Sequence, residues 1–241
     1  MIATQGLIVR LAIISDIHAN LEALQQVLED IRRQQADRIV CLGDIVGYGA
    51  DPVACIELVR EQASMCVLGN HDAALFTDSQ RAYFNPHALE AVRWTAEQLG
   101  ADHRDYLRGL PYRISSDHML FLHATPRAPE EWDYIFSGME ARMQARHFYE
   151  RLCFIGHSHI PGVYPLDADV VEYDPEHRFM INVGSVGQPR DGNWRSSYGL
   201  LDTVAGSYEN RRVEYDVEAA AAKIIANKLP SRLAERLKVG L

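Results

Sequence analysis

The sequence lacks the features that would place the protein in or across a membrane. No apolar run approaches the roughly 18 residues that a spanning helix needs. Residues 1–10 also lack the cationic start, apolar core and small-residue cleavage site of a secretion signal. Low-complexity tracts and repeats of fixed period are absent. We therefore expect an ordinary globular protein without membrane association.

Cysteine is scarce, and its spacing is not that of a disulfide framework. The four cysteines lie at positions 41, 55, 66 and 153, and no two of them form a Cys-x-x-Cys pattern. Cys41, Cys66 and Cys153 each lie within an apolar run, which favours buried free thiols over disulfides or a zinc finger. Free thiols are typical of a reducing compartment, so we expect a cytoplasmic protein.

Positive charge is also in short supply. The chain has 24 Lys and Arg against 33 Asp and Glu, for a formal net charge of −9. A basic surface that grips a nucleic-acid backbone is therefore not expected, and no aromatic platform for single strands is evident. Bound cations could still make one pocket locally positive, so the charge does not exclude a small anionic substrate.

Apolar runs and helical patterns alternate through the first third of the chain. The apolar runs at 7–15, 38–42 and 64–68 are typical of strands that are buried on both faces. Between them, helical patterns cover 20–35, with Asn20 as N-cap, and 51–61. This strand–helix order predicts an α/β fold with a parallel sheet.

The rest of the chain is less regular. Residues 73–117 have the pattern of a helical insert, in which Asp102 is expected to cap a short helix. Shorter strands are predicted at 118–122, 152–155, 179–183, 197–204 and 208–215. Turn residues separate the last three, which favours antiparallel pairing. C-terminal helices follow at about 217–238. Because no long polar linker occurs, we predict a single domain over residues 1–241.

Metal-binding side chains follow five of the predicted strands at their carboxyl ends. They occur in the motifs Asp16-Ile17-His18, Gly43-Asp44, Gly69-Asn70-His71-Asp72, His123 and Gly156-His157-Ser158-His159. Ligands of α/β sheets bind at this edge, and the glycines permit tight turns there. One such motif alone usually marks a surface turn or a structural histidine. Five in succession indicate a site.

The residue types indicate the chemistry of that site. Carboxylate, imidazole and amide groups suit first-row ions such as Mn, Fe, Co, Ni or Zn. His157 and His159 can face different ions if the turn between them is not a regular strand. Asp44 is the natural bridge, since a carboxylate has two oxygens. Two ions roughly 3.5–4 Å apart clamp the attacking and leaving oxygens of an in-line displacement.

These motifs resemble those of the calcineurin-like metallophosphoesterase superfamily, in its branch of small bacterial and archaeal phosphoesterases. The motifs span Asp16 to His159 and the remaining strands also fit, so the resemblance covers nearly the whole chain. It implies a four-layer α-β-β-α sandwich, in which two mixed β-sheets pack face to face with helices outside. It also implies hydrolysis of a small phosphomonoester or phosphodiester, with a hydroxide shared by two metal ions as the nucleophile.

The resemblance implies a role for each site residue. One ion would take Asp16, His18, Asp44 and His159. The other would take Asp44, Asn70, His123 and His157. His71 would be the general acid that protonates the leaving alkoxide. Asp72 would orient His71 and favour its protonated form, or it could instead be a helix N-cap.

Four further residues are predicted to contact substrate. Arg127 and Arg190 could grip phosphate oxygens with forked guanidinium groups, although loop arginines are more often simply solvated. Asn20 and Tyr48 follow metal motifs closely and could line the pocket, although helix capping is the stronger interpretation of Asn20. The loop at 129–135 could overhang the site as a lid or only pack on the domain.

Departures from the family pattern leave the substrate open. Ala124 follows His123 where many relatives have glycine, and Asn182-Val183-Gly184-Ser185 replaces a common Asn-Pro-Gly-Ser. A protein phosphatase or a dinucleoside-polyphosphate hydrolase of the same superfamily is an alternative. A non-catalytic scaffold is disfavoured because His71 and both ligand sets are complete. The sequence predicts no oligomeric state.

Overall fold

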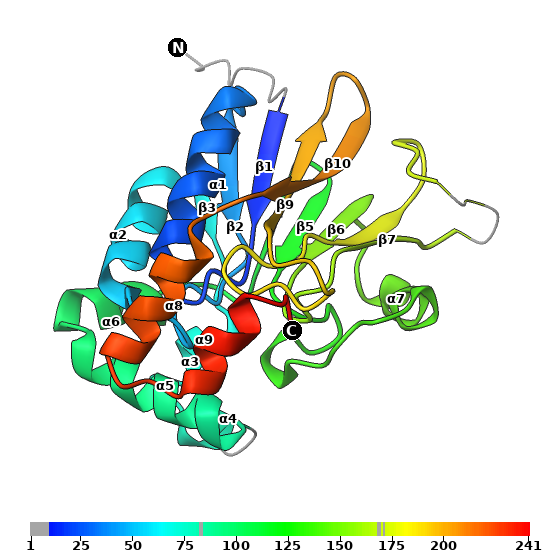
Figure 1. Cartoon of the computed structure of the whole chain (residues 1–241). Coiled ribbons are helices and arrows are strands. Elements are labelled where there is room, and N and C mark those ends of the chain that lie inside the picture. The colour runs from blue at the N-terminus through cyan, green and yellow to red at the C-terminus, as the bar shows by residue number, and fades with distance from the viewer. Residues whose placement is uncertain (1–9, 82–83, 168–169, 171) are drawn as a thin grey trace, which may run out of the picture.

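Two five-stranded sheets form the centre of the protein (Figure 1). The computed structural model describes residues 10–81, 84–167, 170 and 172–241. The strands are β1 (Arg10–Ile14), β2 (Arg38–Cys41), β3 (Met65–Cys66), β4 (Arg113–Ser116), β5 (Met119–Leu122), β6 (Leu152–Ile155), β7 (Gly162–Pro165), β8 (Phe179–Asn182), β9 (Ser196–Asp202) and β10 (Ser207–Val213). The first sheet has the order β10-β9-β1-β2-β3, and the second has the order β4-β5-β6-β8-β7.

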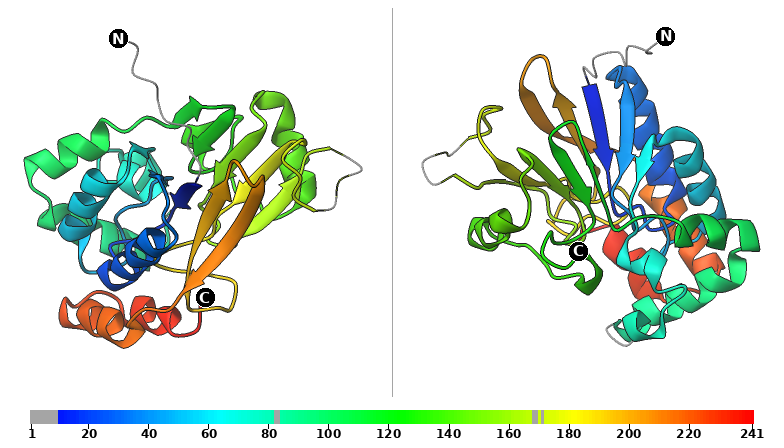
Figure 2. Two further views of the ribbon diagram at one scale, coloured as in Figure 1. Left: turned by 90° about the horizontal axis from the view of Figure 1, so that it is seen from above. Right: turned by 180° about the vertical axis from the view of Figure 1, so that it is seen from behind.

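Helices cover the outer faces of both sheets (Figure 2). They are α1 (Leu21–Arg33), α2 (Pro52–Gln62), α3 (Asn70–Ala73), α4 (Asp78–Arg81), α5 (Pro86–Gln98), α6 (Ala101–Arg108), α7 (Gly138–Gln144), α8 (Val217–Ala226) and α9 (Ser231–Leu237), with short 3₁₀ turns at Pro129–Glu131 and Ala145–His147. Residues from α1, α2, α5, α6, α8 and α9 pack on the first sheet, and α7 packs on the second.

Alternation along β1 shows how the layers form. Leu11 and Ile13 point into the core between the two sheets, whereas Ala12 and Ile14 point into the core beneath the helices. Both faces of the strand are therefore buried, which explains its continuous apolar run. The expected four-layer α-β-β-α arrangement is confirmed.

The parallel strands bring the predicted motifs to one edge of the molecule. β1, β2 and β3 run parallel in the first sheet, and β5, β6 and β8 run parallel in the second. Hydrogen bonds link the loops that follow these strands. The Asp16 amide donates to the Gly43 carbonyl in the first sheet, the Gly156 amide to the His123 carbonyl in the second, and the His157 amide to Asp16 Oδ2 between the two. The helix α9 also reaches this edge (Figure 1).

Some predicted elements differ from the observed ones. The insert at 73–117 is helical only as far as α6, because Arg113–Ser116 forms β4 and pairs antiparallel with β5. Gly100, not Asp102, is the N-cap of α6, and Asp102 lies in its first turn. The third strand is confined to Met65–Cys66, shorter than the apolar run at 64–68.

The predicted antiparallel pairing of the last three strands was partly wrong. β9 and β10 pair antiparallel, but β8 lies in the other sheet, parallel to β6 and antiparallel to β7. Neither β7 nor α7 was predicted, because their short segments are partly polar and lack a clear period. The C-terminal helices lie where the sequence placed them.

Two further expectations concern the chain as a whole. All four cysteines are buried and free, as predicted. Within the described residues, no helix is long and apolar enough to cross a membrane. The N-terminal stretch 1–9, which includes the first residues of the apolar run at 7–15, lies outside the described residues.

Candidate metal centre

The predicted ligands come from sharp turns at the strand ends. Positive φ angles occur at Asp16 (54°), His18 (52°), Asp44 (51°), His157 (65°) and His159 (61°). This left-handed conformation is uncommon for residues with a side chain and is concentrated at functional sites. The turn between His157 and His159 is therefore not a regular strand, which is the condition under which the two rings can face different ions.

All seven predicted metal ligands are buried, and none is more than 8% exposed. Asp16, His18, Asp44 and His123 are at most 1% exposed. Burying ionised carboxylates is costly unless positive charge lies beside them. Positive charge beside these carboxylates, from histidine or from metal ions, would offset that cost.

Main-chain oxygens fix the orientation of the four histidines. The contacts are His18 Nδ1 with Val46 O at 3.1 Å, His123 Nδ1 with Leu42 O at 2.8 Å, His159 Nδ1 with Gln188 O at 2.5 Å, and His157 Nε2 with Trp132 O at 2.8 Å. A carbonyl only accepts, so each of these ring nitrogens carries the proton and donates it. The other nitrogen of each neutral ring has a free lone pair, as in histidines that bind metals.

The free nitrogens gather in two groups. In the first, His18 Nε2 lies 3.1 Å from His159 Nε2, which lies 3.2 Å from Asp16 Oδ1. In the second, His123 Nε2 lies 3.1 Å from Asn70 Oδ1 and 3.2 Å from His157 Nδ1. In the first group, lone pairs at these distances repel each other unless a cation lies between them; in the second group, a cation or a proton on His123 Nε2 would relieve the repulsion.

Asp44 lies between the two groups. Its Oδ2 is 3.6 Å from His18 Nε2 and 3.4 Å from His123 Nε2. Its Oδ1 instead accepts the main-chain N–H of His71 at 2.8 Å. One oxygen, not two as the sequence suggested, therefore faces both groups. A side chain at Gly69 would place Cβ 2.1 Å from Asp44 Oδ1, so this approach requires glycine.

The electrostatics agree with the geometry. Burial disfavours charge on Asp16 and Asp44, but the neighbouring histidines outweigh it and hold the pKa of both carboxyls below the usual range. Burial likewise opposes protonation of His123, but the charges of Asp44 and Asp16 raise its pKa to about 10. The two carboxylates are thus ionised and attract positive charge, which metal ions would supply.

His71 lies beside the first group. Its ring packs at 4.8 Å from His18, 4.4 Å from Tyr48 and 4.6 Å from Phe84. Its Nδ1 is buried without a hydrogen-bond partner among the described residues. His18, Asp44 and His71 also form a set whose ligand atoms lie within 4.8 Å of one another. Burial lowers the pKa of His71 to about 4, although Asp44 opposes the shift.

The structure corrects the expected contact of Asp72. Its carboxylate accepts the amides of Ile45 at 3.0 Å, Val46 at 3.2 Å and Gly69 at 3.2 Å, and it does not bond to His71 Nδ1, which has no partner among the described residues. Gly69 is the N-cap of α3 and Asp72 is its third residue, so the N-cap alternative is also not met. Burial raises the pKa of Asp72 to about 7. Asp72 ties two site loops together.

Comparison with known proteins gives the family. A family model described as the calcineurin-like phosphoesterase superfamily domain matches residues 9–206. The chain belongs to this superfamily. Uncharacterized protein MJ0912 of Methanocaldococcus jannaschii is 40% identical, over 95% of this chain and 98% of its own length.

Solved structures agree with this assignment. A metallophosphoesterase from Sphaerobacter thermophilus is 38% identical, with a TM-score of 0.84 over 97% of this chain and 99% of that one. A curated relative from Glaesserella parasuis, bis(5'-nucleosyl)-tetraphosphatase, symmetrical, is 23% identical over 85% of this chain and 70% of its own length. The family is one of phosphoester hydrolases, and it is generally dependent on two metal ions.

In this member of the phosphoesterase superfamily, a cleft of about 700 Å³ opens over the second group of ligand atoms, which includes Asn70 and His157. It is lined by Tyr48, Asn70, His71, Phe84, Asn85, Ala88, Glu130, Glu131, Trp132, Asp133, Tyr134 and His157. The loop at 129–135 forms one wall, and Trp132 is also only 8% exposed. Both interpretations of that loop therefore hold in part: it borders the site, and it packs on the domain.

Of the predicted substrate residues, Tyr48 and Arg190 reach this region. The Tyr48 ring packs on His18 at 4.6 Å and on His71 at 4.4 Å. Arg190 Nη2 donates to Gln188 Oε1 at 3.0 Å and to Tyr48 Oη at 3.4 Å. Tyr48 thus lines the cleft, and Arg190 contacts Tyr48.

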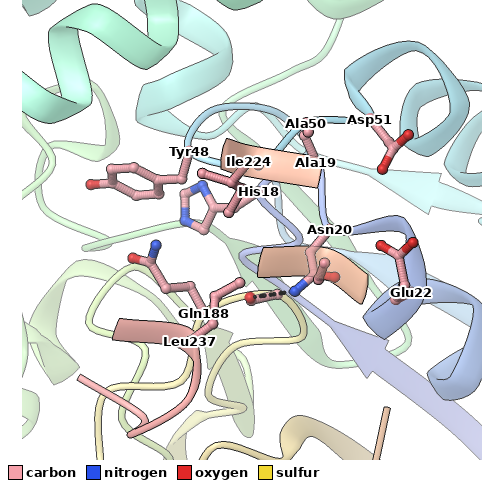
Figure 3. Close-up of a pocket in the computed structure, with 13 residues that line it drawn as sticks. His18, Ala19, Asn20, Glu22, Tyr48, Ala50, Asp51, Gln188, Ile224 and Leu237 are labelled. Atoms are coloured by element: carbon pink, nitrogen blue, oxygen red, sulfur yellow. Dashed lines mark hydrogen bonds between the residues drawn. The ribbon is translucent and has the colours of Figure 1, made fainter. Parts of the chain in front are cut away.

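Asn20 and Arg127 have other partners. Asn20 Oδ1 accepts the Ala23 amide as the α1 N-cap, and Nδ2 donates to the Gly187 carbonyl beside a small cavity behind His18 (Figure 3). Arg127 is 52% exposed and pairs with Asp133 at 2.9 Å. Substrate contact by these two residues stays a prediction.

Several contributors had no sequence signal. The main-chain oxygens of Leu42, Val46, Trp132 and Gln188 orient the histidines, and any residue type supplies a carbonyl. Phe84 packs on His71 from the helical insert, where its apolar side chain gave no functional indication.

Proposed function

We propose that this protein is a two-metal hydrolase of small phosphate esters. The observation that carries the proposal is the first ligand group, in which the lone pairs of His18 Nε2 and His159 Nε2 face one another at 3.1 Å. Main-chain carbonyls fix the protonated nitrogen of both rings, and burial lowers the pKa of both, so a shared proton does not explain this contact. A cation would resolve it, and a second cation could take the place of the proton on His123 in the other group.

The groups on either side of Asp44 would divide the ligands as the family resemblance implies. Asp16, His18, Asp44 and His159 would hold one ion, and Asp44, Asn70, His123 and His157 the other. The absence of thiolate ligands favours Mn, Fe, Zn, Co or Ni. When bound, such ions supply Lewis-acid polarisation of a phosphoryl oxygen and lower the pKa of water near neutrality.

His71 is proposed as the proton donor to the leaving oxygen. It borders both the first ligand group and the cleft, so its ring reaches a phosphate ester bound at the metals. Burial favours its neutral form, but an anionic substrate beside the ring would favour the protonated form. Asp72 would support His71 indirectly, by holding α3 against the loop after β2.

The substrate is proposed to be a small phosphorylated molecule that enters the cleft past Tyr48 and Arg190. Phosphodiesters and phosphomonoesters both fit this proposal. A dinucleoside-polyphosphate hydrolase is the second candidate, supported by the Glaesserella parasuis tetraphosphatase, whose similarity extends over 85% of this chain. Its test is turnover of diadenosine tetraphosphate.

Metal analysis and turnover together test the function. Purified protein should contain transition metal, and manganese should activate hydrolysis of p-nitrophenyl phosphate or bis-p-nitrophenyl phosphate. His71→Ala should lower kcat by about 10²–10⁴-fold, as expected for loss of a general acid, with its metal content unchanged. Metal loss in that variant would make His71 a ligand. Protein without transition metal or manganese-activated turnover would refute the function.

A further inference from the structure

Three arginines gather beside the metal cleft in an otherwise acidic protein. Arg232 and Arg236 of α9 line a hollow of about 820 Å³, which shares Tyr48 and Asn85 with the metal cleft. Arg190 approaches from the loop after β8. We call Arg190, Arg232 and Arg236 the arginine group. Because the chain has a net charge of −9, such a gathering is not the result of a generally basic surface.

Tyr48 joins the arginine group to the metal centre. The guanidinium carbons of Arg190 and Arg236 lie 5.8 and 6.0 Å from the centre of the Tyr48 ring. The same ring is 4.4 Å from the His71 ring and 4.6 Å from the His18 ring. One aromatic ring thus separates the arginines from the candidate metal site, so a single small molecule could contact both.

Two members of the arginine group, Arg190 and Arg232, form no salt bridge in the described part of the chain. Carboxylates pair with other arginines, for example Arg60 with Asp102 and Arg211 with Asp30. By contrast, Arg190 donates only to the neutral groups of Gln188 and Tyr48, and its buried Nε has no partner within the described residues. Its capacity to bind an anion is therefore unused.

The two arginines of α9 differ in their partners. Arg236 Nε donates to an oxygen of Leu241, which in this chain belongs to the carboxylate of the last residue, whereas Arg232 forms no salt bridge among the described residues. Glu235 lines the hollow but forms no salt bridge with either neighbour in the described structure. Arg232 and Arg236 are four residues apart in α9, a spacing at which like charges repel each other and destabilise a helix. Burial and the charge of Arg190 lower the pKa of Arg236 to about 10.

This arrangement is unfavourable for the protein alone and becomes favourable when an anion is bound. Guanidinium groups bind phosphate through paired N–H donors, and a partly buried site strengthens that attraction. We propose that the arginine group binds a second phosphate of the substrate while the first lies at the metal centre. Preferred substrates would then carry at least two phosphate groups. This inference rests on the proposed phosphoesterase function.

Anion binding to the chelator-treated protein tests the arginine group without the metals. Tripolyphosphate and orthophosphate are titrated into the whole protein by isothermal calorimetry. We expect tripolyphosphate to bind more tightly, and Arg232→Ala/Arg236→Ala to weaken its binding at least tenfold. The matched control is Arg142→Ala/Arg146→Ala, which removes two exposed arginines of the same spacing outside both hollows. Equal weakening in both double variants, or in neither, would overturn the proposal.

Turnover with manganese provides the second measurement. The ratio of kcat/KM for diadenosine tetraphosphate to that for bis-p-nitrophenyl phosphate should fall at least tenfold in the α9 double variant. The single variant Arg232→Ala should lower it in the same direction, and it guards against misfolding because Arg232 is exposed. An unchanged ratio would overturn the inference. If neither compound is hydrolysed but tripolyphosphate binding still depends on α9, the proposed function fails and the anion site stands.

Discussion

Gly69→Ala gives a sharp test of how the metal site is held together. Gly69 is the N-cap of α3, and a Cβ there would lie 2.1 Å from both the main-chain nitrogen and Oδ1 of Asp44. Ordinary contacts begin near 3.4 Å, so the two segments must separate by more than 1 Å. Because one of the clashing atoms belongs to the backbone, a change of rotamer cannot relieve the overlap.

The expected cost has two parts. Forcing apart a packed site costs about 1–3 kcal/mol of unfolding free energy. Alanine is also a poorer N-cap than glycine, which adds up to about 1 kcal/mol. Displacing Asp44 should in addition lower turnover about a hundredfold, as a 1 Å misplacement of an active-site group can do.

Gly100→Ala is the matched control. Gly100 is the N-cap of α6, and a Cβ there would find its nearest neighbour at 3.7 Å. Gly100→Ala therefore also replaces glycine by alanine at an N-cap, but the added Cβ causes no steric clash. Urea unfolding in the presence of chelator would compare the two variants without a metal contribution. Equal losses of unfolding free energy in Gly69→Ala and Gly100→Ala would refute the steric reasoning.

Three further predictions concern stability. Asp30 accepts Tyr198 Oη at 2.7 Å and Arg211 Nε at 2.8 Å, so Asp30→Asn should cost about 1–3 kcal/mol by urea unfolding. Burial would raise the pKa of Asp30, but the hydrogen bonds from Arg211 and Tyr198 lower it in the folded protein. The stabilisation by the Asp30 carboxylate is therefore complete above pH about 4 and is lost as the pH falls through the lower folded-state pKa. A cost of Asp30→Asn that does not shrink at low pH would contradict this. Asp72→Asn replaces an acceptor of three amides by a group with one oxygen, and should cost about 1–3 kcal/mol; a thermal melt like that of the wild type would exclude the loop-tying role. Chelation should lower the melting temperature, since metal at a hundredfold excess over Kd contributes about 2.7 kcal/mol, and an unchanged melt in EDTA would argue against resident metal.

The first sheet was predicted well because its signal is local. β1 and β2 are continuous apolar runs, and α1 begins at an N-cap whose side chain accepts the Ala23 amide. Such segments carry their structure in their own composition. The errors fell where pairing decides the structure: β4 and β7 were not predicted as strands, and β8 was predicted as a strand but with the wrong partners. Their sequence gives little indication of which sheet they join.

The site shows the same division. The strand-end motifs indicated which side chains would meet, and the structure brings the seven together. The partners of Asp72 were only partly local: the Gly69 amide lies three residues before it, but the Ile45 and Val46 amides come from the loop after β2, 27 and 26 residues away, and could not be predicted. The single shared oxygen of Asp44 likewise depends on the amide of His71, which occupies the other oxygen.

By itself, the sequence determined the strand–helix order of β1 to β3, the family and the residue types that could hold two metals. Those features depend on composition and on position relative to strand ends, which the chain carries locally. Only the tertiary structure decided which ring nitrogens are free, since carbonyls from distant loops fix the proton positions. It also decided that Arg232 and Arg236 lie beside Tyr48, almost 190 residues away in the chain. That proximity arises because α9 packs its Leu233 face on the core beneath the first sheet.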